Sequence, residues 1–274
     1  MPDGRGEGAR VQADGTMQEE TYQSKTEAAY GLLRRDILAT RLKPGAALKL
    51  GALRDAYGVG WTPLREALSR LEAEKLVTAV SNRGFAVAPV SKAELEDLAR
   101  ARRVVELPLL LESIANGDAE WEAAVVTSHY RLSRCKIAPD DPSEAAVDEW
   151  DEKHTAFHDA LLSAAQSSWL LRFHATISDQ LRRHHRFLGL APTLRAAEGR
   201  QEGYEKAVAA LREAMGIGHH TALMEAALDR DIERARRLME EHIGYTLHAY
   251  IHAEEEAGRR NRPGKAAGRK AAAE

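Results

Sequence analysis

Residues 58–72 read GVGWTPLREALSRLE, a turn glycine followed by a segment with helical periodicity. Its apolar residues recur every three or four positions, as on one face of an α-helix. This face consists of Leu64, Ala67, Leu68 and Leu71. The Thr62 hydroxyl suits an N-cap, and Pro63 suits the first helical position. We therefore expect a helix from Thr62 to about Lys75 that buries its leucine face.

Two further helices are expected before this segment. Apolar residues between Lys25 and Ala39 follow the same helical spacing, and Pro44-Gly45 stops the chain after them. A second, short helix fits Leu50 to Tyr57, and Gly58 supplies the turn glycine after it. The order is helix, helix, tight turn, helix, which is typical of a helix-turn-helix domain.

Two short strands are predicted after the third helix. Leu76 to Val80 and Phe85 to Val90 are rich in β-branched and apolar residues. Ser81-Asn82-Arg83-Gly84 separates them and reads as the turn of a β-hairpin. A three-helix unit followed by a hairpin is a winged helix-turn-helix, so we expect a mainly α fold with a hairpin wing.

The outward side of the third helix predicts DNA binding. With the leucine face packed inward, Arg65, Ser69 and Arg70 point outward. The first turn, with Thr62, offers a phosphate its free amides and the helix dipole, while Arg65 reaches base acceptors in the major groove. Arg83 at the hairpin tip is placed to reach a phosphate or the minor groove. Taken alone, Arg65 and Arg70 would be ordinary solvated charges.

Charge is unevenly divided along the chain. Residues 21–90 contain 11 Lys and Arg against 6 Asp and Glu, a net charge of +5, whereas residues 91–256 contain 20 against 30, a net charge of −10. A basic segment attached to an acidic one suggests a nucleic-acid-facing part joined to a self-sufficient part. Together with the series of helix, turn, helix and hairpin, this excess favours DNA binding over the solvated-charge interpretation.

The rest of the sequence predicts an all-helical bundle. Ser91 and Glu94 form a capping-box pattern at the start of a long helical stretch. Six or seven amphipathic helices follow, which an antiparallel bundle would bury. Their breaks fall at residues 116–117, 138–143, 166–168, 189–193, 216–218 and 229–231. We expect four segments: a disordered tail over 1–20, the DNA-binding domain over 21–90, the helical domain over 91–256 and a basic disordered tail over 257–274.

Composition restricts the compartment. The single cysteine, Cys135, excludes a disulfide framework. No stretch approaches the roughly 20 apolar residues of a membrane-spanning helix, and no basic start leads into an apolar run near the N-terminus. We expect a cytoplasmic protein with no membrane partner.

Histidine spacing in the helical domain indicates a metal site. His154 and His158 are one turn apart, so their imidazoles project from the same helix face. His220 and His242 lie on two helices joined by a short turn at residues 229–231, and antiparallel folding brings them within about one turn in height. A solitary helical histidine is more often a surface or hydrogen-bonded core residue. The other seven of the 11 histidines therefore receive no assignment on spacing grounds.

The N-terminal motifs resemble the GntR family of bacterial regulators. The match spans nearly all of residues 25–90, and it is carried by Pro44-Gly45, Leu53, residues 58–72, Leu76-Val77 and Arg83-Gly84-Phe85. The family usually has Ser-Arg before Thr-Pro, where this chain has Gly60-Trp61. The resemblance implies that an arginine at this position contacts DNA. Trp61 would instead pack on the sugar-phosphate backbone or contact a thymine methyl group.

The C-terminal motifs resemble the FCD domain of the GntR subgroup named for a fatty-acid regulator. They are HTAFHDAL from His154, HTAL from His220 and RRLMEEH ending at His242. The resemblance implies a divalent metal held by one Asp and three His, here by His154, His158, His220 and His242, with His154 in place of the Asp. Four imidazoles favour zinc or nickel over harder cations. Asp151 is placed to orient one of the imidazoles.

A small carboxylate is the expected effector. Open metal positions and a buried arginine both favour carboxylate oxygens. Arg102, which matches the family's Arg-x-x-x-Glu pattern with Glu106, is the first candidate to bind it, and Arg186 is the second. The alternative for Arg102 is a helix salt bridge with Glu106, worth about 0.3–0.5 kcal/mol if exposed. Residues 148–158 also resemble the carbon-starvation-induced regulators of this subgroup, which implies a dicarboxylate such as glutarate.

Three functions remain open at this point. In the first, a homodimer binds a palindromic operator in double-stranded DNA and responds to the effector. The resemblance implies a repressor that its effector releases from DNA, as in most members of the family. In the second, the metal itself is the signal. In the third, the chain is a metalloenzyme with a DNA-binding module, but the His-Glu-x-x-His spacing of such enzymes is absent. We expect the first function and no enzymatic activity.

Overall fold

A computed structural model describes residues 25–80, 84–137, 140–141, 143–190, 208–209, 211–213, 215–244 and 247. The chain divides into two compact units. One comprises Met1–Ser91 and Ala175–His184, and the other comprises Lys92–His174 and His185–Glu274. The expected tails at residues 1–20 and 257–274, and the hairpin tip with Arg83, lie outside the described residues.

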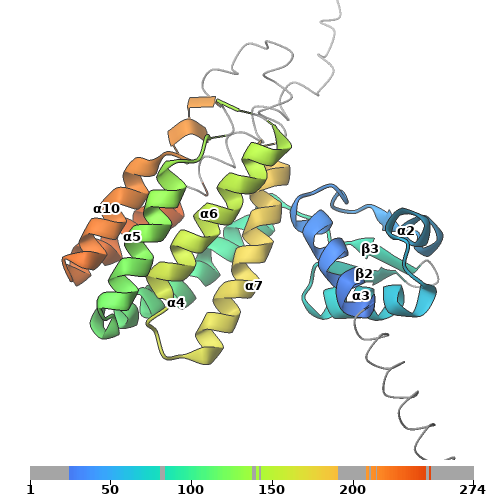
Figure 1. The fold of residues 1–274 in the computed structure, drawn as a ribbon, viewed down its shortest axis with the longest axis horizontal. Coiled ribbons are helices and arrows are strands. Elements are labelled where there is room, and N and C mark those ends of the chain that lie inside the picture. Colours follow the sequence, from blue (N-terminus) through green and yellow to red (C-terminus); the bar gives the residue numbers. More distant parts are fainter. Residues whose placement is uncertain are drawn as a thin grey trace, which may run out of the picture. The chain divides into compact units, whose positions relative to one another are not determined.

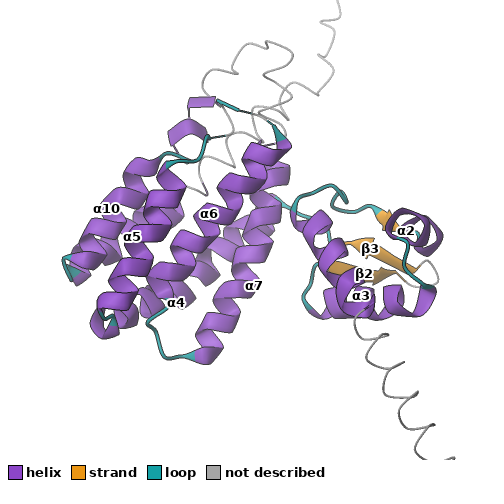
Figure 2. Ribbon diagram, viewed as in Figure 1, coloured by secondary structure: helices purple, strands orange, loops and turns teal. Residues whose placement is uncertain are grey.

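The described residues of the first unit form three helices before residue 91, a small sheet, and the stretch Ala175–His184 of a later helix (Figures 1 and 2). Its elements are a helix over residues 25–38, β1 (Ala47–Leu48), α2 (Leu50–Tyr57), α3 (Trp61–Ala73), β2 (Val77–Val80) and β3 (Gly84–Val87). The strands pair antiparallel in the order β1-β3-β2, and Ala86 of β3 lies opposite both Ala47 and Thr78. The predicted winged helix-turn-helix is confirmed. β1 was not predicted, because two residues are too few to show alternation.

The start of α3 differs from the expectation. Gly60, in an extended conformation and without a side-chain cap bond, is the N-cap, and Trp61 is the first helical residue. The prediction that Thr62 caps this helix is therefore wrong. Pro63 is tolerated in the first turn because the amide it lacks would have no partner within the helix. The N-cap residue therefore provides no side-chain bond to the amides at the start of α3.

One apolar core fixes α3 within this unit. Leu64, Leu68 and Leu71 are fully buried against the other helices and the sheet. Gly58 ends α2 in the left-handed region, with φ 66°, and its amide donates to the Arg54 carbonyl. Leu53 of α2 is buried in the same core. The angle between α2 and α3 is therefore set by a tight turn and shared packing.

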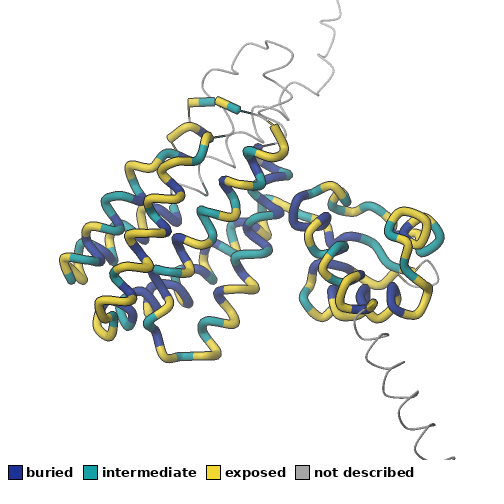
Figure 3. The backbone as a smooth tube through the Cα atoms, viewed as in Figure 1, coloured by how far each residue is buried: buried dark blue, intermediate teal, exposed yellow. Residues whose placement is uncertain are grey.

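The second unit is a bundle of helices. They are α4 (Lys92–Asn116), α5 (Ala119–Ser133), α6 (Glu144–Leu162), the first part of α7 (Ser168–His184), a π-helical segment η1 (His185–Leu190), α10 (Ile217–Leu228) and a helix over residues 232–244. α5 packs against α6 and α10, and α4 packs against α6. Buried and exposed stretches alternate along these helices (Figure 3). The predicted helical C-terminal domain is confirmed. Among the described helices, none is long and apolar enough to cross a membrane.

The end of α10 is tied to the junction between α4 and α5. A Cβ at Gly117 would lie 2.3 Å from the Trp121 ring, so only glycine fits there. Arg230, just after α10, donates to the Ile114 carbonyl at 2.7 Å and to the Gly117 carbonyl at 2.9 Å. Its guanidinium also lies over the Trp121 ring. These contacts fix the turn between α10 and the helix over residues 232–244.

Candidate metal centre and DNA-binding surface

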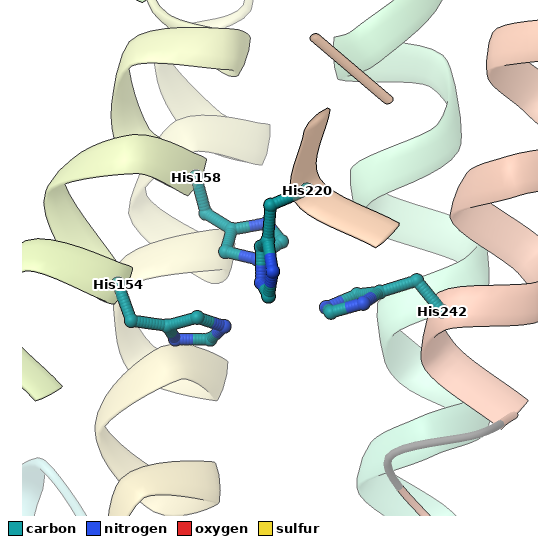
Figure 4. A group of neighbouring side chains, drawn as sticks. All are labelled: His154, His158, His220 and His242. Atoms are coloured by element: carbon teal, nitrogen blue, oxygen red, sulfur yellow. The ribbon is translucent and has the colours of Figure 1, made fainter. Parts of the chain in front are cut away.

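Four imidazoles converge between α6, α10 and the helix over residues 232–244 (Figure 4). One nitrogen from each of His154, His158, His220 and His242 lies within 4.8 Å of the others. His158, His220 and His242 are buried and His154 is half-buried. These three helices thus bring together all four histidines that the sequence singled out.

The nitrogens of this cluster fit a metal ion. Among the described residues, neither ring nitrogen of the buried His158 has a hydrogen-bond partner, and neither does Nε2 of His220. Nδ1 of His220 lies 3.0 Å from the Gly216 carbonyl, so it carries the proton and leaves Nε2 with a lone pair. Buried nitrogens without partners are costly, and a shared ion would satisfy them. Nitrogens bound to one zinc ion lie about 3.4 Å apart, so small side-chain rotations would suffice.

The protonation state of the cluster also suits metal binding. Burial lowers the pKa of His220 to about 4 and those of His154, His158 and His242 well below their ordinary value. The positive charge of the Arg102 guanidinium contributes to this lowering of the pKa at all four imidazoles. All four imidazoles are neutral at pH 7, which is the form that binds metal ions.

Two contacts around His154 were not expected. Trp150 stacks on His154, with ring centroids 4.4 Å apart and 14° between the planes. Asp151, which was expected to orient an imidazole, accepts a hydrogen bond from Arg186 of η1. Arg186 also forms an ion pair with Asp148, at 2.6 Å. The four-residue spacing of Trp150 and His154 on α6 was the signal that could have revealed the stacking.

A buried charge network includes Arg102. Its Nε lies 3.0 Å from both Glu106 oxygens, and its Nη2 lies 2.9 Å from Oε2. His174 of α7 bridges Glu106 at 3.2 Å and Asp159 at 3.0 Å. Histidine spacing gave no signal for His174, because its partners are carboxylates on α4 and α6. The expected pair between Arg102 and Glu106 is present, but it is buried and part of a larger network.

This network shifts two pKa values in opposite directions. Burial alone would raise the pKa of Glu106, but Arg102 and His174 outweigh it and lower that pKa to about 2. Burial alone would lower the pKa of His174, but its hydrogen bonds to Asp159 and Glu106 raise it to about 9. At neutral pH, Glu106 and His174 are therefore both charged.

A stability profile against pH should reveal the network. The pKa of His174 in the folded protein is raised from 6.5 to about 9. Its contribution to the free energy of unfolding is therefore complete below pH 6.5 and is lost as the pH rises to 9. The contribution of Glu106 is present above pH 4.5 and is lost as the pH falls towards 2. We expect urea denaturation of the parent to show a loss of stability above pH 6.5 that His174→Gln lacks. Equal losses in parent and variant would contradict this assignment.

The exposed side of α3 presents most of the predicted DNA-binding residues. Trp61, Thr62, Arg65 and Ser69 are exposed, and Arg65 forms no ion pair with any described residue. Arg70 differs, because its Nη1 lies 2.6 Å from Glu27 and its guanidinium lies 3.9 Å from the Tyr30 ring centroid. Arg70 is therefore engaged with the helix over residues 25–38.

Comparison with known proteins finds two family matches. The family described as "Bacterial regulatory proteins, gntR family" matches residues 25–87, and the "FCD domain" matches residues 97–245. The first match covers the three helices and the sheet. The second covers most of the helical bundle, including all four clustered histidines.

Relatives and solved structures agree with these matches. The "HTH-type transcriptional repressor GlaR" of Escherichia coli (strain K12) is 36% identical over 214 residues, which are 78% of this chain and 90% of that protein. The "Uncharacterized HTH-type transcriptional regulator BphR" of Paraburkholderia xenovorans (strain LB400) is 36% identical over 220 residues, 80% of this chain and 82% of that protein. The structure of E. coli McbR/YncC shares the fold, with a TM-score of 0.64 at 20% identity over 83% of this chain and 97% of that one.

Proposed function

Because the chain belongs to the gntR family of bacterial regulatory proteins and carries an FCD domain, it is a DNA-binding transcriptional regulator, and we propose that a small carboxylate controls its operator affinity. The four converging imidazoles carry this proposal. The families and relatives it matches are regulators rather than enzymes.

The metal of this site is a divalent ion, zinc or nickel. Four neutral nitrogen donors suit these borderline ions and provide no anionic oxygen for magnesium or calcium. When bound, such an ion supplies an electrophilic position for a carboxylate oxygen. The chain's own residues hold it between α6, α10 and the helix over residues 232–244.

Arg102 and Arg186 are the effector-binding candidates, and both are buried. The effect of Arg102 on all four imidazoles supports a cation beside the metal site. Its guanidinium already pairs with Glu106, so an entering carboxylate would share it. Arg186 is held by Asp148 and Asp151, which lie six and three residues before His154 on α6. A dicarboxylate would suit a metal and an arginine at its two ends.

Regulation follows from linkage between the two domains. A homodimer would place its two α3 helices against half-sites about one DNA turn apart. A change in the distance between the two α3 helices would alter the affinity for the operator. Arg83 of the wing would add a phosphate or minor-groove contact. The name of the relative GlaR supports repression, and we propose that the effector releases this repressor from DNA.

Metal content and ligand response test the proposal together. Purified protein should contain zinc or nickel by elemental analysis, and a dicarboxylate such as glutarate should raise its melting temperature in a screen of mono- and dicarboxylates. Protein that binds the metal but no carboxylate, and whose DNA affinity follows the metal alone, would instead be a metal-responsive regulator. The four nitrogen donors, which suit a transition-metal ion, are the observation that favours this second function.

Replacing Arg65 by alanine should weaken operator binding. The side chain is exposed on α3 and has no ion-pair partner among the described residues, so it is available for a base or a phosphate. A contact worth about 1–3 kcal/mol corresponds to a loss of roughly fivefold to 150-fold in affinity. Fluorescence anisotropy with operator DNA at moderate salt measures this loss. Arg70→Ala, which removes an arginine held by Glu27, should cost less; equal affinity of Arg65→Ala and the parent would contradict this recognition surface.

A further inference from the structure

An exposed tryptophan and an arginine form a stacked pair where α2 meets α3. Trp61 is 47% exposed, although it is the first residue of a helix whose other large apolar side chains are buried. The Arg54 guanidinium carbon lies 4.9 Å from the centroid of its ring. On the same face of α2, a Cβ at Gly51 would lie 3.9 Å from the indole, so the ring rests against the α2 backbone.

The pair occupies a rigid position. Arg54 contributes its carbonyl to the left-handed turn at Gly58, which sets the direction of α3. Leu53 and Leu64 beside the pair are buried in the core of this unit. The stacking on the indole then limits the movement of the guanidinium, which otherwise has the freedom of a long surface side chain.

The charges around the pair suit a phosphate. The first turn of α3 contains no acidic residue, and its N-cap, Gly60, has no side chain to bond the free amides. Because Arg54 stacks on Trp61, the first residue of α3, its positive charge lies near the positive end of the helix dipole. Arg54 also pairs with Asp55 at 2.7 Å, but both side chains are exposed, at 46% and 68%. An exposed ion pair is weak and can exchange its carboxylate for a phosphate.

We propose that Arg54 contacts a DNA backbone phosphate and that Trp61 positions its guanidinium for this contact. In the helix-turn-helix arrangement, α3 enters the major groove and the α2 corner faces the backbone. A phosphate contact carries no sequence information, so Arg54 sets affinity on every duplex. Asp55 opposes the contact by competing for the same guanidinium.

The test measures the dissociation constant of the complex between the full-length protein and DNA at several salt concentrations. The probe is a mixed-sequence duplex about three helical turns long, because a phosphate contact acts on any sequence. Arg54→Ala should weaken binding about threefold to tenfold and reduce the salt slope by about one. Arg100→Ala removes an exposed arginine of α4 that pairs with Asp97, and it serves as the matched control with an unchanged slope.

Variants of Trp61 separate positioning from direct contact. If Trp61 acts through Arg54, Trp61→Ala lowers the affinity for DNA. The variant that carries both Arg54→Ala and Trp61→Ala then binds DNA no more weakly than Arg54→Ala alone. Trp61→Phe should restore most of the affinity, and Asp55→Asn should raise it. The proposal is overturned if Arg54→Ala leaves the salt slope unchanged, or if the two losses add fully. Additive losses would mean that the indole contacts DNA itself.

Discussion

Replacing Glu106 by glutamine is expected to lower the free energy of unfolding by about 3–5 kcal/mol. The carboxylate is buried, pairs with Arg102 and accepts a hydrogen bond from His174. Glutamine keeps the volume but leaves a buried guanidinium without its counter-charge, which costs more than the lost hydrogen bonds. Chemical denaturation followed by circular dichroism at pH 6 measures the change, because the network is fully charged there.

The matched control lies on the same helix. Asp97 pairs with Arg100 at 2.7 Å, but both side chains are exposed, at 74% and 67%. Asp97→Asn should therefore cost at most about 1 kcal/mol. If Glu106→Gln and Asp97→Asn destabilise the protein equally, the buried network is not a principal source of stability in α4.

Replacing His158 by alanine should remove the metal site. Both of its ring nitrogens are buried without a hydrogen-bond partner among the described residues, and its ring lies within 5 Å of those of His154 and His242. The loss of one donor in four should weaken metal affinity at least about 100-fold. A metal at 100 times its dissociation constant stabilises the fold by about 2.7 kcal/mol, and the variant would lack this contribution. Elemental analysis and thermal unfolding measure the two effects.

A neighbouring histidine provides the control for this experiment. His219 precedes His220 on α10 but lies outside the cluster. His219→Ala should keep its metal, whereas chelation should bring the parent close to the stability of His158→Ala. DNA binding of His158→Ala at low temperature, without effector, should persist. Full metal content in His158→Ala would place the site elsewhere.

The sequence predicted the N-terminal fold because each of its elements has a local cause. Leucines at helical spacing, the turn glycine Gly58 and the β-branched stretches after Lys75 specify helices, turn and hairpin. The error at Thr62 also has a local cause. A hydroxyl before Pro63 fits an N-cap, but the helix starts one residue earlier at Trp61, where the indole packs against α2.

The site could be predicted only where spacing along one helix or one hairpin decides proximity. His154 and His158 share a helix face, and a short turn joins the helices of His220 and His242. The contacts of Glu106 and Arg186 were harder to predict, because His174 and Asp151 reach them from helices distant in sequence. The stacking of Arg54 on Trp61 was missed for the same reason. It depends on the angle between two helices, which no periodicity encodes.

Control of operator affinity by a carboxylate is expected to depend on the four-histidine metal site. The decisive measurement is the dissociation constant of metal-loaded, full-length protein for its tightest-binding DNA fragment, titrated with glutarate before and after chelation. Glutarate should weaken DNA binding about fivefold to 150-fold before chelation and have no effect after it. A glutarate effect of the same size after the metal has been removed would contradict this dependence.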